Sequence, residues 1–497
     1  MGHAAGALDK LPMKRVFSRI IKVIGLAALF VFAALLAWAF ESRSMPALQV
    51  WHTPLVNEFT ARDATPRSTL QDYLDQEARL FDELRDKVYA RVESTDTLTY
   101  NRYLAGGLQN PEWQQQNWNR TFELVPEVIK GGALLLHGLT DSPYSLRRIG
   151  ELLYSEGFYV VGLRLPGHGT VPGAMTQMRW QDWVAASRIG ARHVREQIGP
   201  ELPFIVAGYS NGGALSVKYA LDALTEPDLP VPDRLLLFSP EIGIAPLARI
   251  ANAHELLSFL PYFEKFKWLS IEPEYDPFKY NSFPKNAAQE AWAMTAEVHR
   301  QIQEAHDAGR FLSFPAVLTF LSWTDATVNT SATVQQLYDR LENAGSELVI
   351  FDVNRMHRLI PFIPAATESP LEQLEASTDL PYRLTVITNA ASDTAQLEER
   401  SRAPRSGETR SRPLSLAWPH GVYSLAHVAI PFPSDDPVYG TGKSGRGNYQ
   451  GLPLGALQPH GETRLLTASL SQLMRLRYNP FFTYVEQRVV GEIDNAM

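Results

Sequence analysis

The feature that most constrains the fold is a pattern that repeats from residue 131 to residue 351: a short apolar run, then a longer segment with helical periodicity. Such alternation is typical of βαβ units, in which crossover helices join parallel strands. Units of this kind form a wound, mostly parallel sheet with helices packed on it. We expect strands at 132–136, 159–163, 204–207, 234–238, 317–321 and 348–351, and helices at 145–156, 180–198, 213–223 and 331–344.

Two stretches interrupt this alternation within the predicted domain, 127–497. Residues 240–314 are aromatic and helical, and they follow a strand at a point where a cap over an active site can be inserted; a purely structural subdomain is the alternative. Residues 353–423 contain one more expected strand, 382–388. The polar segment 395–412 that follows it is predicted to be a solvated loop.

The N-terminal part has a distinct charge pattern. Several basic residues within segment 1–22 precede an uncharged run, 23–40, and Glu41 follows it. A helix over this run would be roughly 27 Å long, close to the thickness of a bilayer core. We therefore expect a cytoplasmic segment, a single-pass helix, and a catalytic part on the periplasmic or extracellular side. A signal peptide cleaved near residues 37–39 and a buried soluble helix are the alternatives.

The segment that follows, 41–126, contains an expected helix at 69–92 and no residues that indicate chemistry, so we interpret it as a spacer and a layer over the core. Composition excludes several functions. The chain has no cysteine, which rules out thiolate catalysis, disulfides and cysteine-bound metals. Its net charge of −8 is spread without long blocks of like charge, so nucleic acid is not an expected partner.

A nucleophilic serine is indicated by the sequence Gly208-Tyr-Ser-Asn-Gly, which follows an apolar run and precedes a helical one. This context is that of a nucleophile elbow, in which the serine occupies a strained turn between strand and helix. Ser210 would then be the nucleophile. The oxyanion formed on attack needs backbone donors, for which the sequence offers the amides of Asn211 and Leu139.

Three motifs in this order resemble the carboxylesterase and monoacylglycerol-lipase branch of the α/β-hydrolases. They are His137-Gly-Leu-Thr-Asp-Ser-Pro, Leu165-Pro-Gly-His-Gly-Thr and Gly208-Tyr-Ser-Asn-Gly-Gly, and Trp180-Gln-Asp-Trp stands where that branch has a similar helix start. The resemblance is close over residues 131–240 and looser beyond them. It implies an α/β-hydrolase fold and a triad in the chain order serine, acid, histidine.

The acid implied by the resemblance is Asp325, which follows an expected strand, and Asp352 is the reserve. Two histidines compete as base. His357 has the usual spacing after the acid, whereas His427 lies in Ser424-Leu-Ala-His-Val, which is similar to the family's histidine loop. We favour His427, with the second insertion explaining its distance. The remaining noted histidines, at 137, 168 and 420, are interpreted as structural or surface residues.

No metal-ligand spacing and no phosphate-binding glycine loop occurs in the sequence, so no metal or cofactor is expected, and the pair Asp435-Asp436 is interpreted as a solvated turn. We predict a serine hydrolase of hydrophobic or lipid esters that works by acyl transfer. Peptidase, thioesterase and acyltransferase activities share such a triad, and a catalytically silent scaffold of the cell envelope is a further alternative. The sequence carries no signal for the oligomeric state.

Overall fold

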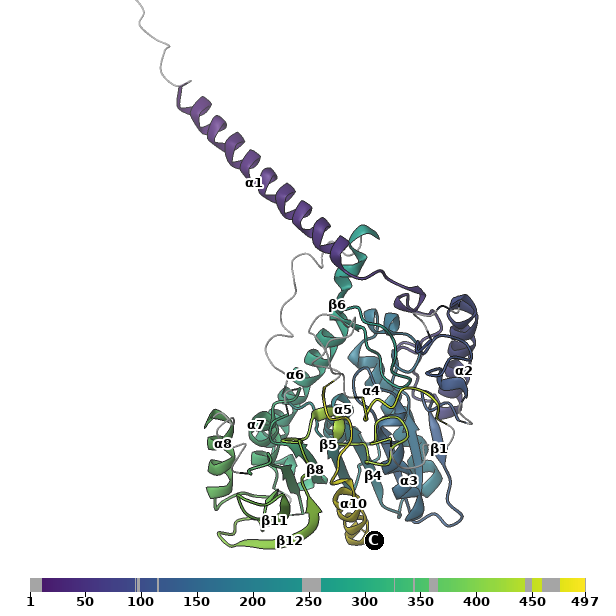
Figure 1. Cartoon of the computed structure of the whole chain (residues 1–497), viewed down its shortest axis with the longest axis vertical. Helices are drawn as coiled ribbons and strands as arrows, with labels where there is room; N and C mark the ends of the chain where they lie inside the picture. Colours follow the sequence, from purple (N-terminus) through teal and green to yellow (C-terminus); the bar gives the residue numbers. More distant parts are fainter. Residues whose placement is uncertain are drawn as a thin grey trace, which may run out of the picture.

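The computed structural model describes residues 11–93, 95, 99–113, 116–243, 261–325, 327–342, 345–356, 365–442, 449–457 and 474–496. Its centre is a ten-stranded sheet in the order β1-β3-β2-β4-β5-β8-β9-β10-β11-β12 (Figure 1). The neighbours from β3 to β10 pair in parallel, and the outer pairs are antiparallel. The strands are β1 (Phe122–Leu124), β2 (Gly131–Leu136), β3 (Phe158–Leu163), β4 (Phe204–Tyr209), β5 (Arg234–Phe238), β8 (Ala316–Ser322), β9 (Glu347–Phe351), β10 (Arg383–Asn389), β11 (Gln396–Arg402) and β12 (Thr409–Ala417).

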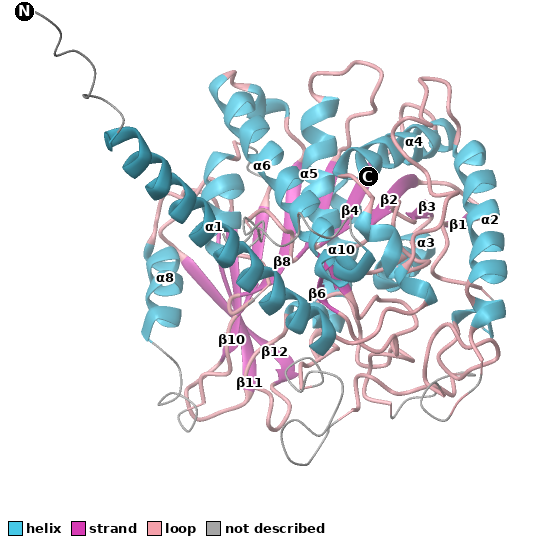
Figure 2. Ribbon diagram, turned by 90° about the horizontal axis from the view of Figure 1, so that it is seen from above, coloured by secondary structure: helices cyan, strands magenta, loops and turns pink. Residues whose placement is uncertain are grey.

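Helices cover both faces of this sheet (Figure 2). On one face, α4 (Trp180–Ile198), α5 (Asn211–Ala223) and α6 (Lys285–Asp307) share a hydrophobic core with β2, β4, β5 and β8. On the other face, α3 (Arg147–Ser155) and α10 (Phe482–Ala496) pack against the alternate residues of the same strands. The predicted wound parallel sheet with crossover helices is therefore confirmed, and the predicted strands lie within one or two residues of the observed ones.

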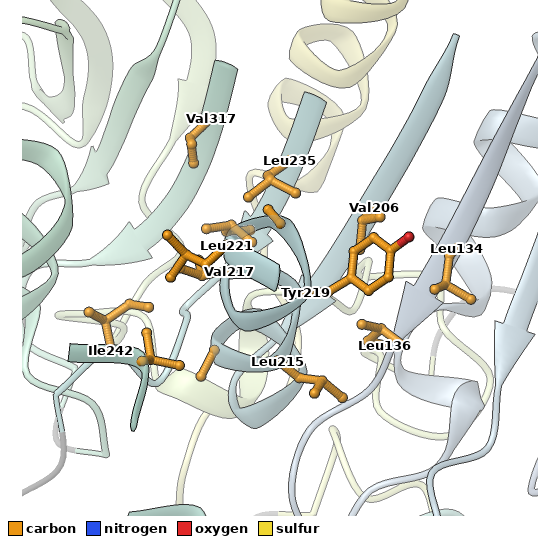
Figure 3. Packing of buried hydrophobic residues seen from close by; sticks show 14 of the residues in the cluster. Leu134, Leu136, Val206, Leu215, Val217, Tyr219, Leu221, Leu235, Ile242 and Val317 are labelled. Atoms are coloured by element: carbon orange, nitrogen blue, oxygen red, sulfur yellow. The ribbon is translucent and has the colours of Figure 1, made fainter. Parts of the chain in front are cut away.

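The central strands are fully buried, which explains why they read as continuous apolar runs rather than as alternating ones. Figure 3 shows the core on the α5 side, where Leu215, Val217 and Leu221 of the helix lie against Val206 of β4 and Leu235 of β5. Parallel pairing of β5 with β4 and with β8 places the C-terminal ends of these three strands side by side. Those ends carry the functional side chains described below.

The polar segment 395–412 is not a loop, and that prediction was wrong. Strands β11 and β12 occupy most of it and extend the sheet in antiparallel fashion beyond β10. Their backbone groups pair within the sheet, while the side chains of β12 are mostly exposed and those of β11 mostly only partly buried, so a charged composition is compatible with a strand here. Glu399 lies directly opposite Arg412, and their side chains form an ion pair at 2.8 Å. The expected strand 382–388 corresponds to β10.

The second insertion leaves and rejoins the core of the sheet domain at neighbouring points. The backbone N–H of Asn354 donates to the carbonyl of Tyr423 at 2.8 Å, and its side-chain amide donates to the carbonyl of Val422 at 3.0 Å. The segment between them contains α8 (Ala365–Ala376), β10, β11 and β12. The chain thus returns to the end of β9 just before the segment that contains His427.

The helix expected at 331–344 is irregular. It is divided into α7 (Thr330–Ala332), a π-helical turn (Thr333–Leu337) and a 3₁₀ turn (Tyr338–Arg340), and it ends before residue 341. Within the first insertion, only part has the character of a cap. Helix α6 belongs to the main core, whereas the segment from β6 (Trp268–Ser270) to β7 (Phe283–Pro284) lies beside the predicted nucleophile. Residues 244–260 lie outside the described part.

Helix α1 (Leu11–Ser44) extends away from the rest of the molecule (Figure 1). Its C-terminal end is held by Lys265, whose ammonium donates to the carbonyls of Ser42 at 3.1 Å and Met45 at 2.8 Å. Apart from the partly buried Trp38, the large apolar side chains described from Phe17 to Phe40 are 49% to 78% exposed. Among the described residues no helix is long and apolar enough to cross a membrane, so the single-pass helix predicted at 23–40 is not supported.

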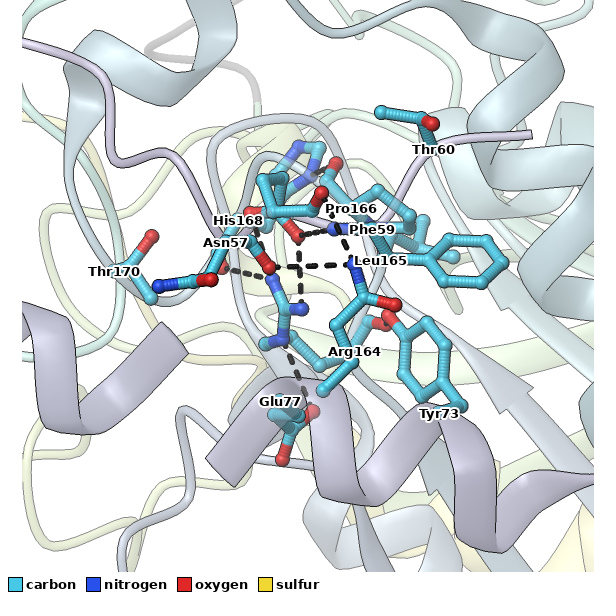
Figure 4. Close-up of polar contacts among 12 residues, drawn as sticks. Asn57, Phe59, Thr60, Tyr73, Glu77, Arg164, Leu165, Pro166, His168 and Thr170 are labelled. Atoms are coloured by element: carbon cyan, nitrogen blue, oxygen red, sulfur yellow. Dashed lines mark hydrogen bonds and ion pairs between the residues drawn. The ribbon is translucent and has the colours of Figure 1, made fainter. Parts of the chain in front are cut away.

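Helix α2 (Leu70–Lys87) ties the N-terminal layer to the core. Figure 4 shows Arg164, which follows β3, between Glu77 of α2 and the loop that contains His168. The guanidinium is almost completely buried; it donates to Glu77 at 3.0 Å and to both carboxylate oxygens of Glu58 at 2.9 and 3.1 Å. The Tyr73 hydroxyl donates to the Arg164 carbonyl at 2.6 Å. This layer therefore supports the loop at residues 165–170 rather than serving as a mere spacer.

Replacing Arg164 by leucine is expected to lower the free energy of unfolding by about 3–5 kcal/mol, because the carboxylates of Glu58 and Glu77 would stay buried without their cation. Urea unfolding followed by tryptophan fluorescence would measure the loss. The partly exposed pair Arg148–Glu486 provides a control, since Arg148→Leu should cost less than about 1 kcal/mol. Equal losses in the two variants would contradict the assigned role of Arg164.

Candidate active site

Ser210 lies in the sharp turn between β4 and α5. Its backbone has φ 55° and ψ −118°, a left-handed conformation that is strained for a residue other than glycine. Glycines 208 and 212 make the turn possible. A Cβ on Gly208 would collide with the carbonyl of Gly212, and a Cβ on Gly212 would collide with the carbonyl of Leu136 on β2. The turn has the geometry expected of a nucleophile elbow.

The loop after β2 passes directly over Ser210. A Cβ on Gly138 would lie 3.2 Å from the Cβ of Ser210, and Leu139 lines the same cavity as the serine. The following residue, Thr140, has φ 67°, and its carbonyl accepts from the backbone N–H of Tyr280 at 2.9 Å. On the other side, Asn211 is the first residue of α5, where an N–H has no acceptor within the helix. Both predicted oxyanion donors thus belong to backbone that borders the serine.

His427 lies within hydrogen-bonding distance of both Ser210 and Asp325. Its Nε2 is 2.9 Å from the Ser210 hydroxyl, and its Nδ1 is 2.7 Å from a carboxylate oxygen of Asp325. A carboxylate can only accept, so Nδ1 carries the proton and Nε2 is left to accept from the serine hydroxyl. The structure therefore brings together the three residues that the sequence singled out from segments more than 100 positions apart.

Asp325 follows β8 in a short turn, and its carboxylate is completely buried. The oxygen that does not face His427 accepts from the backbone N–H groups of Thr327 at 2.8 Å and Val328 at 3.0 Å. Burial raises the pKa of Asp325, but the charge and hydrogen bond of His427 together with these N–H groups outweigh it, so the pKa falls below its ordinary value. The group is therefore ionised at neutral pH. The next helix, α7, has its own N-cap in Asn329.

The alternatives considered for the triad lie elsewhere. The reserve acid, Asp352, is paired with Arg355 and accepts from the Thr388 hydroxyl at 2.7 Å, so both its oxygens are engaged at the end of β9. His357 lies outside the described residues. His420 is exposed.

His137 and His168 shape the loops next to the serine. The Nδ1 of His137 lies 2.9 Å from the carbonyl of Gly138, and its Nε2 accepts from the backbone N–H of Leu165 at 2.9 Å. That acceptor role requires a neutral ring, and burial holds the pKa of His137 well below its ordinary value. His168 donates to the carbonyl of Pro166, which also accepts from the indole of Trp183 at 3.1 Å. The two histidines therefore join the motifs around residues 137, 165 and 180.

A cavity of about 350 Å³ opens over Ser210 and His427. Sequence reasoning missed five charged residues that line it: Asp141, Glu241, Lys279, Arg475 and Arg477. They come from loops that are remote in sequence, so periodicity gave no signal for them, although Glu241 follows an expected strand just as Asp325 does. The other lining residues are Leu139, Thr140, Tyr209, Ser270, Tyr280, Asn281, Phe283, Thr327 and Val428.

Part of the chain is similar to known proteins. Residues 128–360 match the family model described as serine aminopeptidase, S33. This part of the chain belongs to the α/β-hydrolase superfamily. A thermostable monoacylglycerol lipase from Bacillus sp. (strain H-257) is 35% identical over 89 residues, which are 18% of this chain and 34% of the relative. The chain thus matches about a third of the length of that curated relative.

Solved structures with a similar chain path include a metagenome-derived lipolytic enzyme, at 20% identity and a TM-score of 0.38, covering 53% of this chain and all of the other. The monoacylglycerol lipase of Paleococcus ferrophilus has 19% identity and a TM-score of 0.33 over 47% of this chain and 88% of its own.

In this α/β-hydrolase, Asp436 was wrongly interpreted as part of a solvated turn. Its carboxylate is buried, accepts from the Tyr144 hydroxyl at 3.1 Å and from the backbone N–H groups of residues 438 and 439, and faces Arg147 at 3.5 Å. The pair Asp435-Asp436 in the sequence gave no indication that Asp436 is buried, because its side-chain partners, Tyr144 and Arg147, come from the loop and helix after β2. Asp436 fixes the chain that follows the His427 turn.

Glu241, in the cavity of the α/β-hydrolase, has a strongly raised pKa. Burial, with the nearby charge of Asp325 as a second cause, raises its pKa from 4.5 to about 7. Between pH 4.5 and 7 the folded protein retains a proton that the unfolded chain has lost, so this group makes the protein less stable as the pH rises through that window. Below pH 4.5 the carboxyl is protonated in both the folded and the unfolded state, so this loss of stability is absent.

Glu241→Gln removes this titration and is therefore expected to raise the free energy of unfolding, relative to the unmodified protein, by up to about 3 kcal/mol more at pH 8 than at pH 5. Urea unfolding at the two pH values measures the difference. The same comparison for Glu297→Gln, on the surface of α6, should show no gain at pH 8. A pH-independent effect of Glu241→Gln would contradict the raised pKa.

Proposed function

We propose that the protein is a serine hydrolase of carboxylic esters that acts through an acyl-enzyme on Ser210. The observation that carries this proposal is the continuous hydrogen-bonded chain from the Ser210 hydroxyl through His427 to Asp325, at 2.9 and 2.7 Å. A serine hydroxyl is a weak nucleophile, and a base within hydrogen-bonding distance, oriented by a third group, is what activates it. The strained elbow presents that hydroxyl to the cavity.

In the proposed mechanism His427 accepts the Ser210 proton as the hydroxyl oxygen attacks the ester carbonyl. Asp325 holds the imidazole in the required tautomer and stabilises the imidazolium by its charge. The amides of Leu139 and Asn211 receive the negative charge that develops on the carbonyl oxygen. His427 then protonates the leaving alcohol. In the second half of the reaction His427 accepts a proton from water as the water attacks the acyl-enzyme, and it returns that proton to Ser210 as the acid is released.

Esters are favoured over amides by the relatives, since the Bacillus protein matching this chain is named a monoacylglycerol lipase. The cavity of about 350 Å³ suits a short acyl chain or the polar end of a longer one. Small ester or lipid molecules are therefore the proposed substrates. Peptidase, thioesterase and acyltransferase reactions proceed through the same acyl-enzyme and are the competing candidates.

The test combines labelling with a substrate series. Purified protein should react with a fluorophosphonate probe, and peptide mass spectrometry should find the adduct on Ser210. It should hydrolyse p-nitrophenyl esters and monoglycerides of graded chain length, and it should leave a matched p-nitroanilide amide intact. An adduct on another residue, or neither labelling nor ester hydrolysis, would refute the proposal and favour a silent scaffold. Faster cleavage of the amide would favour a peptidase.

We further propose that α1 associates with a lipid surface, which would keep the enzyme near lipid esters. The support is the row of large apolar side chains that α1 exposes, together with basic residues at positions 10, 14, 15, 19 and 22. Flotation with anionic lipid vesicles should carry the full chain and leave behind a chain that lacks residues 1–44. Equal flotation of both forms would contradict this proposal without affecting the proposed reaction.

A further inference from the structure

The loop that carries the proposed oxyanion donor Leu139 has an unusual backbone. Residues 138–141 form a β-turn in which the backbone N–H of Asp141 donates to the carbonyl of Gly138 at 3.2 Å. Leu139 is the second residue of this β-turn. The third, Thr140, has φ 67°, a position that normally takes glycine and that is strained for a β-branched residue. Such strain persists only where the surrounding structure holds the residue in place.

The structure that holds this β-turn belongs to the first insertion. Residues 274–282, which we call the cap turn, contact it at two successive positions. The backbone N–H of Tyr280 donates to the carbonyl of Thr140 at 2.9 Å. The Lys279 ammonium lies 3.3 Å from a carboxylate oxygen of Asp141. Both contacts act on the second half of the β-turn, so a shift of the cap turn would release the strained φ of Thr140.

Arg102 of the N-terminal layer holds the cap turn in place. Its side chain is almost completely buried, and the guanidinium donates to the backbone carbonyls of Asp276 and Lys279, each at 3.3 Å. The backbone N–H of Arg102 donates to the carbonyl of Glu274 at 2.9 Å. The guanidinium also lies over the Tyr280 ring, 5.4 Å from its centre. Arg102 does not line the cavity, so its effect on the reaction is transmitted through the residues that it holds.

Further buried hydrogen bonds fix the shape of the cap turn. The side-chain amide of Asn119, also in the N-terminal layer, donates to the carbonyl of Pro277 at 2.9 Å. Within the cap turn, the buried carboxylate of Glu274 accepts from the backbone N–H groups of residues 281 and 282, at 3.1 and 2.8 Å. The N-terminal layer therefore sets the position of the cap turn against the β-turn.

We propose that Arg102 is a positioning residue for the oxyanion hole. Through the cap turn it keeps Thr140 in its strained conformation, and this conformation directs the N–H of Leu139 toward the substrate carbonyl. The inference rests on the proposed acyl-enzyme reaction and identifies what shapes one of its two oxyanion donors. A donor to the oxyanion stabilises the transition state more than the bound ester, so loss of this support should lower kcat rather than raise KM.

Arg102→Met removes the donors and keeps a long side chain. It should lower kcat for p-nitrophenyl acetate and p-nitrophenyl hexanoate by the same factor, roughly tenfold to a hundredfold. The factor is shared because the oxyanion hole binds the carbonyl that both esters have, whereas damage to the cavity wall would affect the longer ester more. The inhibition constant of a trifluoromethyl ketone, which forms an oxyanion adduct with a nucleophilic serine, should rise by that factor.

Arg120→Met is the matched control. Arg120 lies in the same layer, but its guanidinium is placed over the Phe81 ring of α2, 4.0 Å from the centre. Its replacement should leave kcat unchanged. If Arg102→Met does not fold, Asn119→Ala removes one bond to the cap turn and takes its place in every comparison.

The decisive comparison uses the variant Thr140→Gly. Glycine adopts a positive φ without strain, so the β-turn keeps its shape without support from the cap turn. In the Thr140→Gly background Arg102→Met should therefore lower kcat by less than about threefold. Each factor is taken within one background and per active site, counted by complete fluorophosphonate labelling. Equal factors in the two backgrounds, an effect confined to KM, or the same loss in Arg120→Met would overturn the inference.

Failure of this inference can be told apart from failure of the proposed function. Ester hydrolysis that depends on Ser210 but is unchanged in Arg102→Met would overturn the role of Arg102 and leave the proposed function intact. Failure of the unmodified protein to hydrolyse either ester, together with failure of labelling at Ser210, would overturn both.

Discussion

Alanine at Ser210 or at His427 is expected to lower kcat for ester hydrolysis by about 10⁶-fold, and the double variant is expected to be no slower than either single one. The reason is that hydroxyl and imidazole work as one unit: the 2.9 Å hydrogen bond between them has no catalytic use once either partner is gone. Stopped assays with p-nitrophenyl butyrate at high enzyme concentration measure the residual rates.

His357→Ala is the matched control, because His357 has the more usual spacing after Asp325, whereas His427 is the histidine whose Nε2 lies 2.9 Å from the Ser210 hydroxyl. That variant should retain most of the activity. A large loss in His357→Ala with little loss in His427→Ala would reverse the assignment of the base. Multiplicative losses in the double variant of Ser210 and His427 would show that these two residues act independently.

Asp325→Asn is expected to lower kcat by about 10⁴-fold, although the substitution hardly changes the shape of the side chain. The carboxylate accepts a hydrogen bond from the protonated Nδ1 of His427 at 2.7 Å. An amide NH₂ in that position would donate instead and would favour the opposite tautomer of the imidazole. Nε2 would then carry the proton and could not accept from Ser210. The fall should appear in kcat, since the acid does not line the cavity.

Asp352→Asn is the corresponding control at the end of the next strand. It weakens the pairing with Arg355 and the bond from Thr388, and should therefore lower stability rather than kcat. Thermal unfolding and kcat measured on both variants separate the two effects. A smaller change in kcat for Asp325→Asn than for Asp352→Asn would exclude Asp325 as the acid.

The fold was predictable where the signal is local. Buried parallel strands read as apolar runs, and the elbow at Ser210 needs glycines at fixed offsets, so both are visible within a dozen residues. The local motif singled out His427, 102 positions after Asp325, although spacing alone favoured His357, and in the structure His427 lies between Ser210 and Asp325. The polar strands β11 and β12 were missed because their pairing depends on a neighbouring strand edge and on cross-strand ion pairs such as Glu399–Arg412.

The charged lining of the cavity was missed for a related reason. Whether Glu241 or Asp436 is buried depends on which distant segments pack over it, and nothing in the adjacent sequence encodes that. Conversely, the irregular helix after Asp325 and the long α1 show that periodicity gives the type of an element more reliably than its regularity or its bounds.

The closure of the second insertion by Asn354 on the carbonyls of residues 422 and 423 separates the length of the insertion from the geometry of the base. Since both ends of the excursion are clamped at one point, the entropy of closing it grows only with the logarithm of its length. Homologues could therefore carry much shorter or longer excursions here with the histidine unmoved. Residue spacing is then a poor guide for aligning the proposed base, His427, and an alignment should instead be anchored on the hydrogen bonds of Asn354.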